Sequence, residues 1–485
     1  MNIRQKTYSA LIWSAADKCG EQVLRFVFSI IMARLLLPEH FGLVGMTYVI
    51  IEIARVFIQS GFGLAIINES NVTEKDLCSV FYFNVFIGTI ASVILVIIAP
   101  VIADFYDNKE VIPIIKLMSV IIFIGSFGSI HNVILTKKIN FKGQAKVNLP
   151  STFLSGVMGV LLAVLGYGVW ALVYQAVFRT ILNTLLLWFM SRWRPGFVFS
   201  LKSLKKLFRF GSKLLLGSIV QILFNNLYVI VIGKFFSPAL LGYYSRAKQT
   251  QDLPVNTIWD ILGRVTFPVM SSIKNDPEKL RLALSKASGN IAFVTFPLLV
   301  TGAIIAPSLF RVIFGERWLP CVPIFRLLCF ANLFIALENV RANAVLSKGN
   351  SALCFRLLCL RNFLILISVA FSFRLGINVM LLAHGIIAYF FFSVYSLYTE
   401  KETGYSFGAQ LSDLLPYALC TTISGLTTYG VTVLYSSTQI CSLLLQIFTG
   451  ATVYILCSIV LKLEAITDSR EFASVVLSKI FKTQH

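Results

Sequence analysis

The stretch RLLLPEHFGLVG, residues 34–45, has a counterpart 200 positions further along the chain, KFFSPALLGYYS at residues 234–245. The same shift of 200 positions aligns further residues: Pro38 with Pro238, Gly42 with Gly242, Glu21 with Gln221, Arg25 with Asn225, Glu52 with Asp252 and Gly63 with Gly263. A solenoid unit recurs every few tens of residues, so this period is too long for one. It predicts two homologous lobes of several membrane helices each, an architecture typical of secondary transporters.

The composition is that of a polytopic membrane protein. Of 485 residues, 57% are hydrophobic and 13% are charged, and the mean hydropathy is +0.81. Soluble domains are about 45–50% apolar and about 25% charged. The formal net charge of +20 is explained by Lys and Arg in cytoplasmic loops, so we predict no nucleic-acid partner.

Residues 9–37 form the first apolar stretch, and it carries Asp17, Lys18, Glu21 and Arg25. These charges make it a poor signal peptide, so we interpret it as an uncleaved membrane helix. The nine cysteines include no CxxC pair, and we predict no metal site and no bound cofactor. Coupling to H⁺ or Na⁺ is left open.

A spanning helix needs roughly 20 mostly apolar residues, and this criterion predicts about 14 of them. The predicted spans are 9–37, 41–67, 79–103, 111–135, 147–166, 169–191, 210–236, 239–271, 284–307, 320–346, 352–373, 376–399, 412–436 and 438–461. We therefore expect an all-α polytopic fold with two pseudo-symmetric six-helix lobes. The lobes are residues 1–200 and 201–400, and residues 401–485 add two helices and a cytoplasmic tail.

Basic residues gather in alternate loops of this scheme. The loops predicted to be cytoplasmic hold Lys137, Lys138, Lys142, Lys146, Arg192, Arg194, Lys202, Lys205, Lys206, Arg209, Lys274, Lys279, Arg281 and Lys286. The positive-inside rule then places both termini in the cytoplasm. Residues 197–210 have leucines on one face and basic residues on the other. This pattern predicts an amphipathic helix on the inner leaflet that links the two lobes.

Ionisable groups inside membrane helices are costly unless they face a protein-lined or wet cavity. We expect six basic residues to bind an anionic substrate in such a cavity: Arg25, Arg55, Arg179, Arg341, Lys248 and Arg264. A second set is expected to line the cavity or couple ions: Asp17, Glu21, Glu52, Asp252, Asp260, Asn225 and Gln221. Spacings of three and four residues put most of them on single helix faces. The alternative is that they form ion pairs that only join helices.

The segments FGLVGMTYVIIEIARVFIQSGFGLAIIN and IGKFFSPALLGYYSRAKQTQDLPVN resemble a known family. It is the polysaccharide transporters of the multidrug/oligosaccharidyl-lipid/polysaccharide exporter superfamily, and more narrowly the Wzx-type flippases and colanic-acid-exporter-like proteins. The resemblance covers nearly the whole chain. Its most specific piece is GYYSRA, residues 242–247.

This resemblance implies two six-helix lobes in a V shape and two additional C-terminal helices. It implies a glycan on undecaprenyl diphosphate, moved by alternating access from the inner to the outer leaflet of a bacterial inner membrane. Cavity-facing basic residues of the family correspond to Arg25, Arg55 and Arg264. Where many members carry an acidic residue in the seventh helix, this chain has Asn225. A glycan polymerase and glycosyltransferases of the same pathway are implied partners, besides membrane lipids.

Other functions stay open at this point. A lipid II flippase would work by a closely related mechanism, and a drug or cation antiporter of the same superfamily would need a less cationic cavity. An enzyme is disfavoured, because the sequence offers no Ser-His-Asp set, no paired carboxylates on a loop and no metal cluster. We predict no catalytic residues, and we interpret His131 and His384 as structural.

Overall fold

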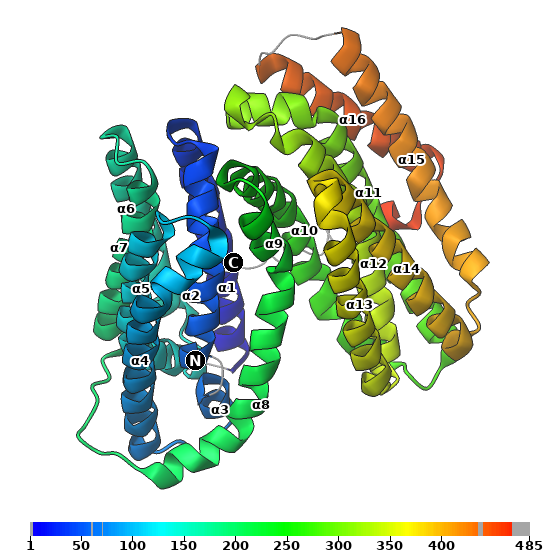
Figure 1. Ribbon diagram of the computed structural model, residues 1–485. Coiled ribbons are helices and arrows are strands. Elements are labelled where there is room, and N and C mark those ends of the chain that lie inside the picture. Colours follow the sequence, from blue (N-terminus) through cyan, green and yellow to red (C-terminus); the bar gives the residue numbers. More distant parts are fainter. Residues whose placement is uncertain (1–2, 60–61, 70, 435–439, 468–485) are drawn as a thin grey trace, which may run out of the picture. The chain divides into compact units, whose positions relative to one another are not determined.

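The computed structural model describes residues 3–59, 62–69, 71–434 and 440–467 (Figure 1). Within these ranges every regular element is a helix. The elements are α1 (Ile3–Leu35), α2 (Pro38–Gln59), α3 (Phe62–Asn68), α4 (Glu74–Tyr106), α5 (Val111–Lys137), α6 (Phe141–Val164), α7 (Val169–Ser191), α8 (Leu201–Asn225), α9 (Leu227–Phe235), α10 (Pro238–Ser272), α11 (Pro277–Ile313), η1 (Glu316–Trp318), α12 (Cys321–Ser347), α13 (Ser351–Ser372), η2 (Phe373–Leu375), α14 (Ile377–Thr403), α15 (Phe407–Leu434) and α16 (Ile440–Val460).

The helices confirm the all-α polytopic fold. Each predicted span overlaps a long helix, with α8 and α9 together standing for the span 210–236. In the described part of the chain, ten helices are long and apolar enough to cross a membrane, or eleven if the bent α8–α9 pair is one span. Helices α1, α10 and α15 fall short of that criterion. Two of these, α1 and α10, carry the charged residues expected at a polar site.

One predicted span is bent, and another falls on two described helices. The span 41–67 contains α2, which ends at Gln59, and the short α3, which begins at Phe62; residues 60 and 61 lie outside the described part of the chain. The span 210–236 bends by 49° between Asn225 and Leu227. At that bend the Asn226 side chain donates a hydrogen bond to the carbonyl of Ile222 at 3.0 Å. Such side-chain bonds to the backbone compete with the helical ladder. The linker helix expected at residues 197–210 begins only at Leu201, and it is continuous with this span as α8.

Several helices extend beyond the predicted limits, because they continue from the hydrocarbon into the interface. Helix α4 begins at Glu74, where Thr73 and Asp76 form a reciprocal capping box. Helix α11 begins at Pro277, and the Asp276 side chain accepts a hydrogen bond from the Lys279 amide at 3.1 Å. Both caps satisfy amide groups that the first helical turn leaves unpaired.

The chain divides into two compact units, Met1–Ser245 and Arg246–His485. In the first unit α5 packs against α4 and α7, α6 packs against α1 and α7, and α8 and α9 pack against α2 and α4. In the second unit α11 contacts α12, α15 and α16, and α12 contacts α14. The unit boundary falls inside α10, whose first residues belong with the first unit. The division into six-helix lobes by the repeat stays a prediction.

An aromatic cluster in the first unit surrounds His131. The His131 ring lies 4.8 Å from the Trp188 ring and 5.4 Å from the Trp193 ring, centroid to centroid. Its Nδ1 is 2.6 Å from the Ser191 hydroxyl, and the residue is fully buried. This environment fits the structural role that we expected for His131.

Candidate functional site: a cationic pocket in the first unit

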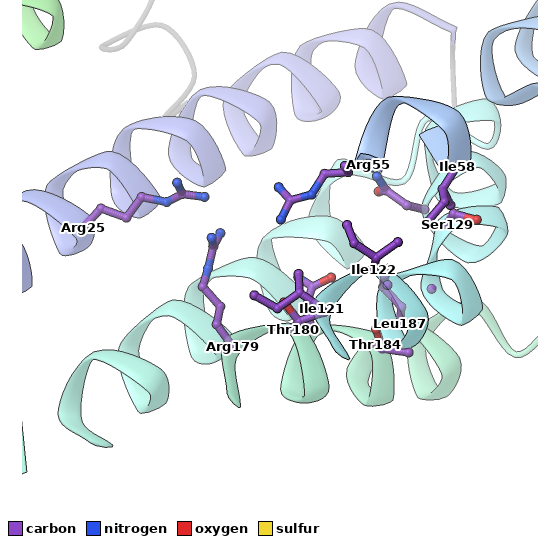
Figure 2. Close-up of a pocket in the computed structure, with 14 residues that line it drawn as sticks. Arg25, Arg55, Ile58, Ile121, Ile122, Ser129, Arg179, Thr180, Thr184 and Leu187 are labelled. Atoms are coloured by element: carbon purple, nitrogen blue, oxygen red, sulfur yellow. The ribbon is translucent and has the colours of Figure 1, made fainter. Parts of the chain in front are cut away.

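A pocket of about 200 Å³ lies among helices α1, α2, α5 and α7 of the first unit. Arg25 of α1, Arg55 of α2 and Arg179 of α7 line it. Figure 2 shows the three guanidinium groups pointing toward one another across this space. The structure therefore gathers three of the six basic residues that we expected to bind substrate.

Local sequence explains how the pocket stays open beside these long side chains. Helix α5 contributes Gly125 and Gly128 to the lining, so no side chain from these positions fills the space. Ile121 and Ile122, one turn earlier on α5, and Leu187 of α7 form an apolar wall. The result is a pocket with a cationic side, an apolar wall and room for a ligand.

Two carboxylates accompany the arginines. The Glu21 Oε1 atom accepts hydrogen bonds from Arg25, at 2.6 Å from Nη2, and from Arg179. Glu52 pairs with Arg55 at 3.3 Å. The pairing expected from the ion-pair alternative therefore exists. With all five groups ionised, three positive and two negative charges leave one net positive charge at the pocket.

The arginines are unequally accessible. The Arg25 side chain is 52% exposed, against 31% for Arg179. A guanidinium has five N–H donors in a fork that matches phosphate oxygens. Arg25 and Arg55 each use part of this fork on a neighbouring carboxylate, so donors are left for an anion in the pocket.

Asp17 lies next to this site and not in its lining. Its side chain accepts hydrogen bonds from Asn148 Nδ2 at 3.0 and 3.3 Å, and the residue is 8% exposed. Asn148 in turn accepts from Asn183 Nδ2 at 3.0 Å. This chain of amides links α1 through α6 to α7 and reaches the pocket at Asn183.

Sequence reasoning missed the neutral polar residues of the pocket. They come from α5 and α7, and they are Ser129, Asn132, Thr180, Asn183 and Thr184. Their spacing of three or four residues within each helix puts each set on one face. That spacing was a readable signal, because polar residues on one face of a membrane helix point to a protein interior or a wet cavity.

Other expected residues are not among the lining of this pocket. Lys248 pairs with Asp252 at 3.0 Å on α10, and both side chains are about one-third exposed. Gln221 and Asn225 are exposed on α8. The side chains of Asp260 and Arg264 lie outside the described residues, although both positions belong to α10. Their assignment to the site stays a prediction.

Arg341 is enclosed in the interior of the second unit. It is 1% exposed and donates to Ser396 Oγ at 2.7 Å and to Gln410 Oε1 at 3.0 Å. Its guanidinium carbon lies 4.4 Å from the centroid of the Phe392 ring. These neutral partners join α12, α14 and α15, so in this conformation Arg341 serves packing and not an open cavity.

The second unit contains a larger cavity of about 560 Å³ lined by α10, α11, α12 and α16. Its walls are mostly aliphatic and aromatic, including Phe293, Leu298 and Ile305. The cavity offers few polar groups, among them Gln251 and Tyr454. Its chemistry suits hydrocarbon and not a charged headgroup.

Comparison with known proteins places this site in context. The profile of the family described as "Polysaccharide biosynthesis protein" matches residues 31–323. The chain is similar to the teichuronic acid biosynthesis protein TuaB of Bacillus subtilis, with 30% identity over 62% of this chain and 63% of that protein. It thus spans less than two thirds of TuaB. The lipopolysaccharide biosynthesis protein WzxC of Escherichia coli is 26% identical over 80% of this chain and 81% of its own.

Solved structures agree on the fold. The lipid II flippase MurJ in an inward closed conformation matches with a TM-score of 0.75 and 16% identity, over 94% of this chain and all of that chain (100%). An inward-facing multidrug resistance transporter of the MATE family matches with a TM-score of 0.54 and 17% identity, over 79% of this chain and 94% of that one. At these identities the likeness concerns the fold alone.

Proposed function

Because the chain belongs to the polysaccharide biosynthesis protein family, we propose that it is a flippase for a lipid-linked oligosaccharide. The substrate is a short glycan on undecaprenyl diphosphate, such as a repeat unit of O-antigen, capsule or exopolysaccharide. It moves from the cytoplasmic to the outer leaflet of a bacterial inner membrane. The observation that carries the proposal is the convergence of Arg25, Arg55 and Arg179 on one pocket.

The arginines supply the chemistry that a diphosphate needs. Guanidinium groups bind phosphate oxygens bidentately and stay charged at any physiological pH. The net positive charge of the pocket favours an anion over a cation, which argues against a cationic drug as substrate. The name of one relative supports the same kind of substrate. This relative, ExoT of Rhizobium meliloti, is 26% identical and is named a succinoglycan biosynthesis transport protein.

A protein is needed because the glycan cannot cross hydrocarbon unaided. Each hydroxyl that loses its hydrogen bonds there costs several kcal/mol. The diphosphate adds charge, and each elementary charge that moves through the membrane potential changes the free energy by about 2.3 kcal/mol per 100 mV. With the inside negative, this term drives anions outward. Alternating access of the two repeat halves would expose the headgroup first to one side and then to the other.

Several finer points belong to the same proposal. Both termini lie in the cytoplasm, and a glycan polymerase and glycosyltransferases act on the same lipid before and after transport. Ion coupling, if it operates, uses carboxylates of the charged spans: Asp17, Glu21, Glu52, Asp252 and Asp260. Replacing each by its amide and measuring transport tests this, and unchanged transport in every variant would remove ion coupling from the mechanism.

A lipid II flippase is the second candidate, because the fold likeness to MurJ is high and both substrates carry a prenyl diphosphate. Loss of a lipid II flippase and loss of a flippase for another glycan have different consequences for the cell. Loss of lipid II transport stops cell-wall synthesis and growth, whereas loss of export of another glycan removes a surface polymer. Viability of a deletion strain with no redundant flippase therefore separates them.

The decisive test is the leaflet distribution of undecaprenyl-diphosphate glycans in cells that lack this protein. We expect them to accumulate on the cytoplasmic face, with rescue by the native gene and by Arg356→Ala but not by Arg25→Ala. Arg356 is exposed on α13 and lies outside the pocket lining, so it is a matched control. A normal distribution without the protein would overturn the proposal, and rescue by Arg25→Ala would remove Arg25 from it.

A further inference from the structure

We propose that the neutral polar edge of the cationic pocket is a subsite for the sugar attached directly to the diphosphate. The inference rests on the proposed function and makes it more specific. The edge consists of Ser129 and Asn132 of α5 and Thr180, Asn183 and Thr184 of α7. No charged group stands among these five residues, which sets the edge apart from the arginine side.

Hydrogen-bonding capacity remains at this edge. Asn183 donates its amide N–H to Asn148 at 3.0 Å, which leaves its carbonyl oxygen as an acceptor. Asn132 accepts from Gln144 at 2.9 Å, which leaves its amide group as a donor. The Thr180 hydroxyl donates to the carbonyl of Ala176 and keeps its lone pairs. Sugar hydroxyls both donate and accept, so they can satisfy this mixed set, whereas a second phosphate needs donors only.

The aliphatic part of the lining matches the apolar faces of a sugar. Ile121, Ile122 and Leu187 present aliphatic surface to the same space, and Figure 2 shows Ile121 and Ile122 beside Thr180. A pyranose ring has C–H groups on its faces and hydroxyls at its rim. A pocket with an aliphatic wall and an amide and hydroxyl edge is complementary to both.

Position points to the first sugar as the occupant. The pocket is small, about 200 Å³, so it does not enclose a diphosphate together with a whole oligosaccharide. The arginines line the same pocket, and in the lipid the sugar is bonded directly to the phosphate that they would hold. Later sugars of the glycan must then extend away from the pocket.

Gly125 gives a way to fill the subsite without disturbing its frame. A β-carbon at this position would meet only the Thr180 methyl carbon, at 3.9 Å, which is an ordinary contact. Alanine also favours helices over glycine. Gly125→Ala should therefore fold and intrude on the sugar while leaving the arginines in place. Gly430→Ala on α15 is the matched control, because a β-carbon there has no atom within 4 Å.

The experiment measures binding to the purified full-length protein. The probes are farnesyl diphosphate, which has no sugar, and farnesyl diphosphates that carry one glucose, galactose or N-acetylglucosamine. We expect the native protein and Gly430→Ala to bind one of the sugar-bearing probes more tightly than the sugarless probe. Asn183→Ala should lose about two- to tenfold of affinity for that probe, the range of one or two hydrogen bonds, and Gly125→Ala should lose affinity because its methyl group enters the space of the sugar. Affinity for farnesyl diphosphate should fall by a smaller factor in both variants.

The possible results distinguish a failure of the sugar subsite from a failure of the proposed flippase function. Retention of the sugar preference by Gly125→Ala and Asn183→Ala, or an equal loss for both kinds of probe, would overturn the subsite and leave the flippase proposal standing. No binding of any probe by the native protein would overturn diphosphate recognition itself, and the subsite with it. Arg25→Ala should weaken all probes alike.

Discussion

The carbonyl oxygen of Pro238 lies 1.8 Å from the position that a β-carbon on Gly42 would occupy. The relationship is reciprocal, because the Pro38 carbonyl oxygen lies 1.9 Å from the same position on Gly242. The first turns of α2 and α10 therefore cross with their backbones in contact. Close approach of this kind needs glycine at the crossing point, as in small-residue contacts of membrane helices.

Gly42→Ala should destabilise the protein. Alanine gains up to about 1 kcal/mol in helix propensity over glycine, but overpacking costs about 1–3 kcal/mol, and here the clashing atom belongs to the backbone. We expect a lower midpoint of thermal unfolding in detergent. Gly45→Ala is the control one turn along, where the nearest atoms to a β-carbon lie at 3.6 Å. Equal midpoints for the two variants would contradict the crossing.

Glu21→Gln should strengthen binding of an anion to the pocket. Glutamine keeps the shape of the side chain but removes one negative charge shared by Arg25 and Arg179. A partly exposed charge is worth about 0.3–1 kcal/mol, so affinity for farnesyl diphosphate should rise about two- to fivefold and the gain should shrink in high salt. Glu402→Gln, at an exposed site bonded to Asn350, should change nothing. Weaker binding by Glu21→Gln would contradict an anion site.

Arg341→Ala should lower stability and leave ligand binding intact. The change opens a cavity and leaves Gln410 Oε1 buried without its donor. We expect a loss of about 3 kcal/mol in the free energy of unfolding. Affinity of the folded protein for farnesyl diphosphate should equal the native value. Normal stability with weaker binding would return Arg341 to the substrate site that we expected from the sequence.

Ionisation of Tyr405 is expected to lower the stability of the folded protein at alkaline pH. It lies between α14 and α15, where burial and then its hydrogen bond to Asp413 raise the pKa of Tyr405 from 10 to about 12. As the pH rises, the unfolded chain therefore releases the Tyr405 proton at a lower pH than the folded protein does. The stability that the protonated Tyr405 adds to the folded state is complete below pH 10 and is lost as the pH rises toward 12. Unfolding midpoints between pH 9 and 12 should fall less steeply in Tyr405→Phe. Parallel curves for the two proteins would show that Tyr405 is not responsible.

Hydropathy predicted the helices well because hydrocarbon acts on whole windows of about 20 residues. It did not predict where helices such as α4 and α11 begin, because these ends depend on single capping groups outside the hydrocarbon. The capping box of Thr73 and Asp76 lies within a few positions in the sequence and was readable. The bend after Asn225 was not, because one asparagine in a helix is compatible with several side-chain arrangements.

The cationic pocket could be predicted in part. Spacing placed Glu21 and Arg25 on one face of α1, and the structure pairs them. The contact of Glu21 with Arg179 joins residues 158 positions apart, and no local pattern encodes which helices become neighbours. For the same reason the sequence could not distinguish Arg25, which lines a pocket, from Arg341, which is enclosed by Ser396 and Gln410.

The reciprocal crossing also has an evolutionary meaning. Arg25 and Asn225 differ between the two copies of the repeat, whereas Gly42 and Gly242 are the same, and each of these glycines faces a proline of the other copy. A larger residue at either glycine would collide with the backbone of the other copy. A change at one of the two positions is therefore constrained by the sequence of the other copy.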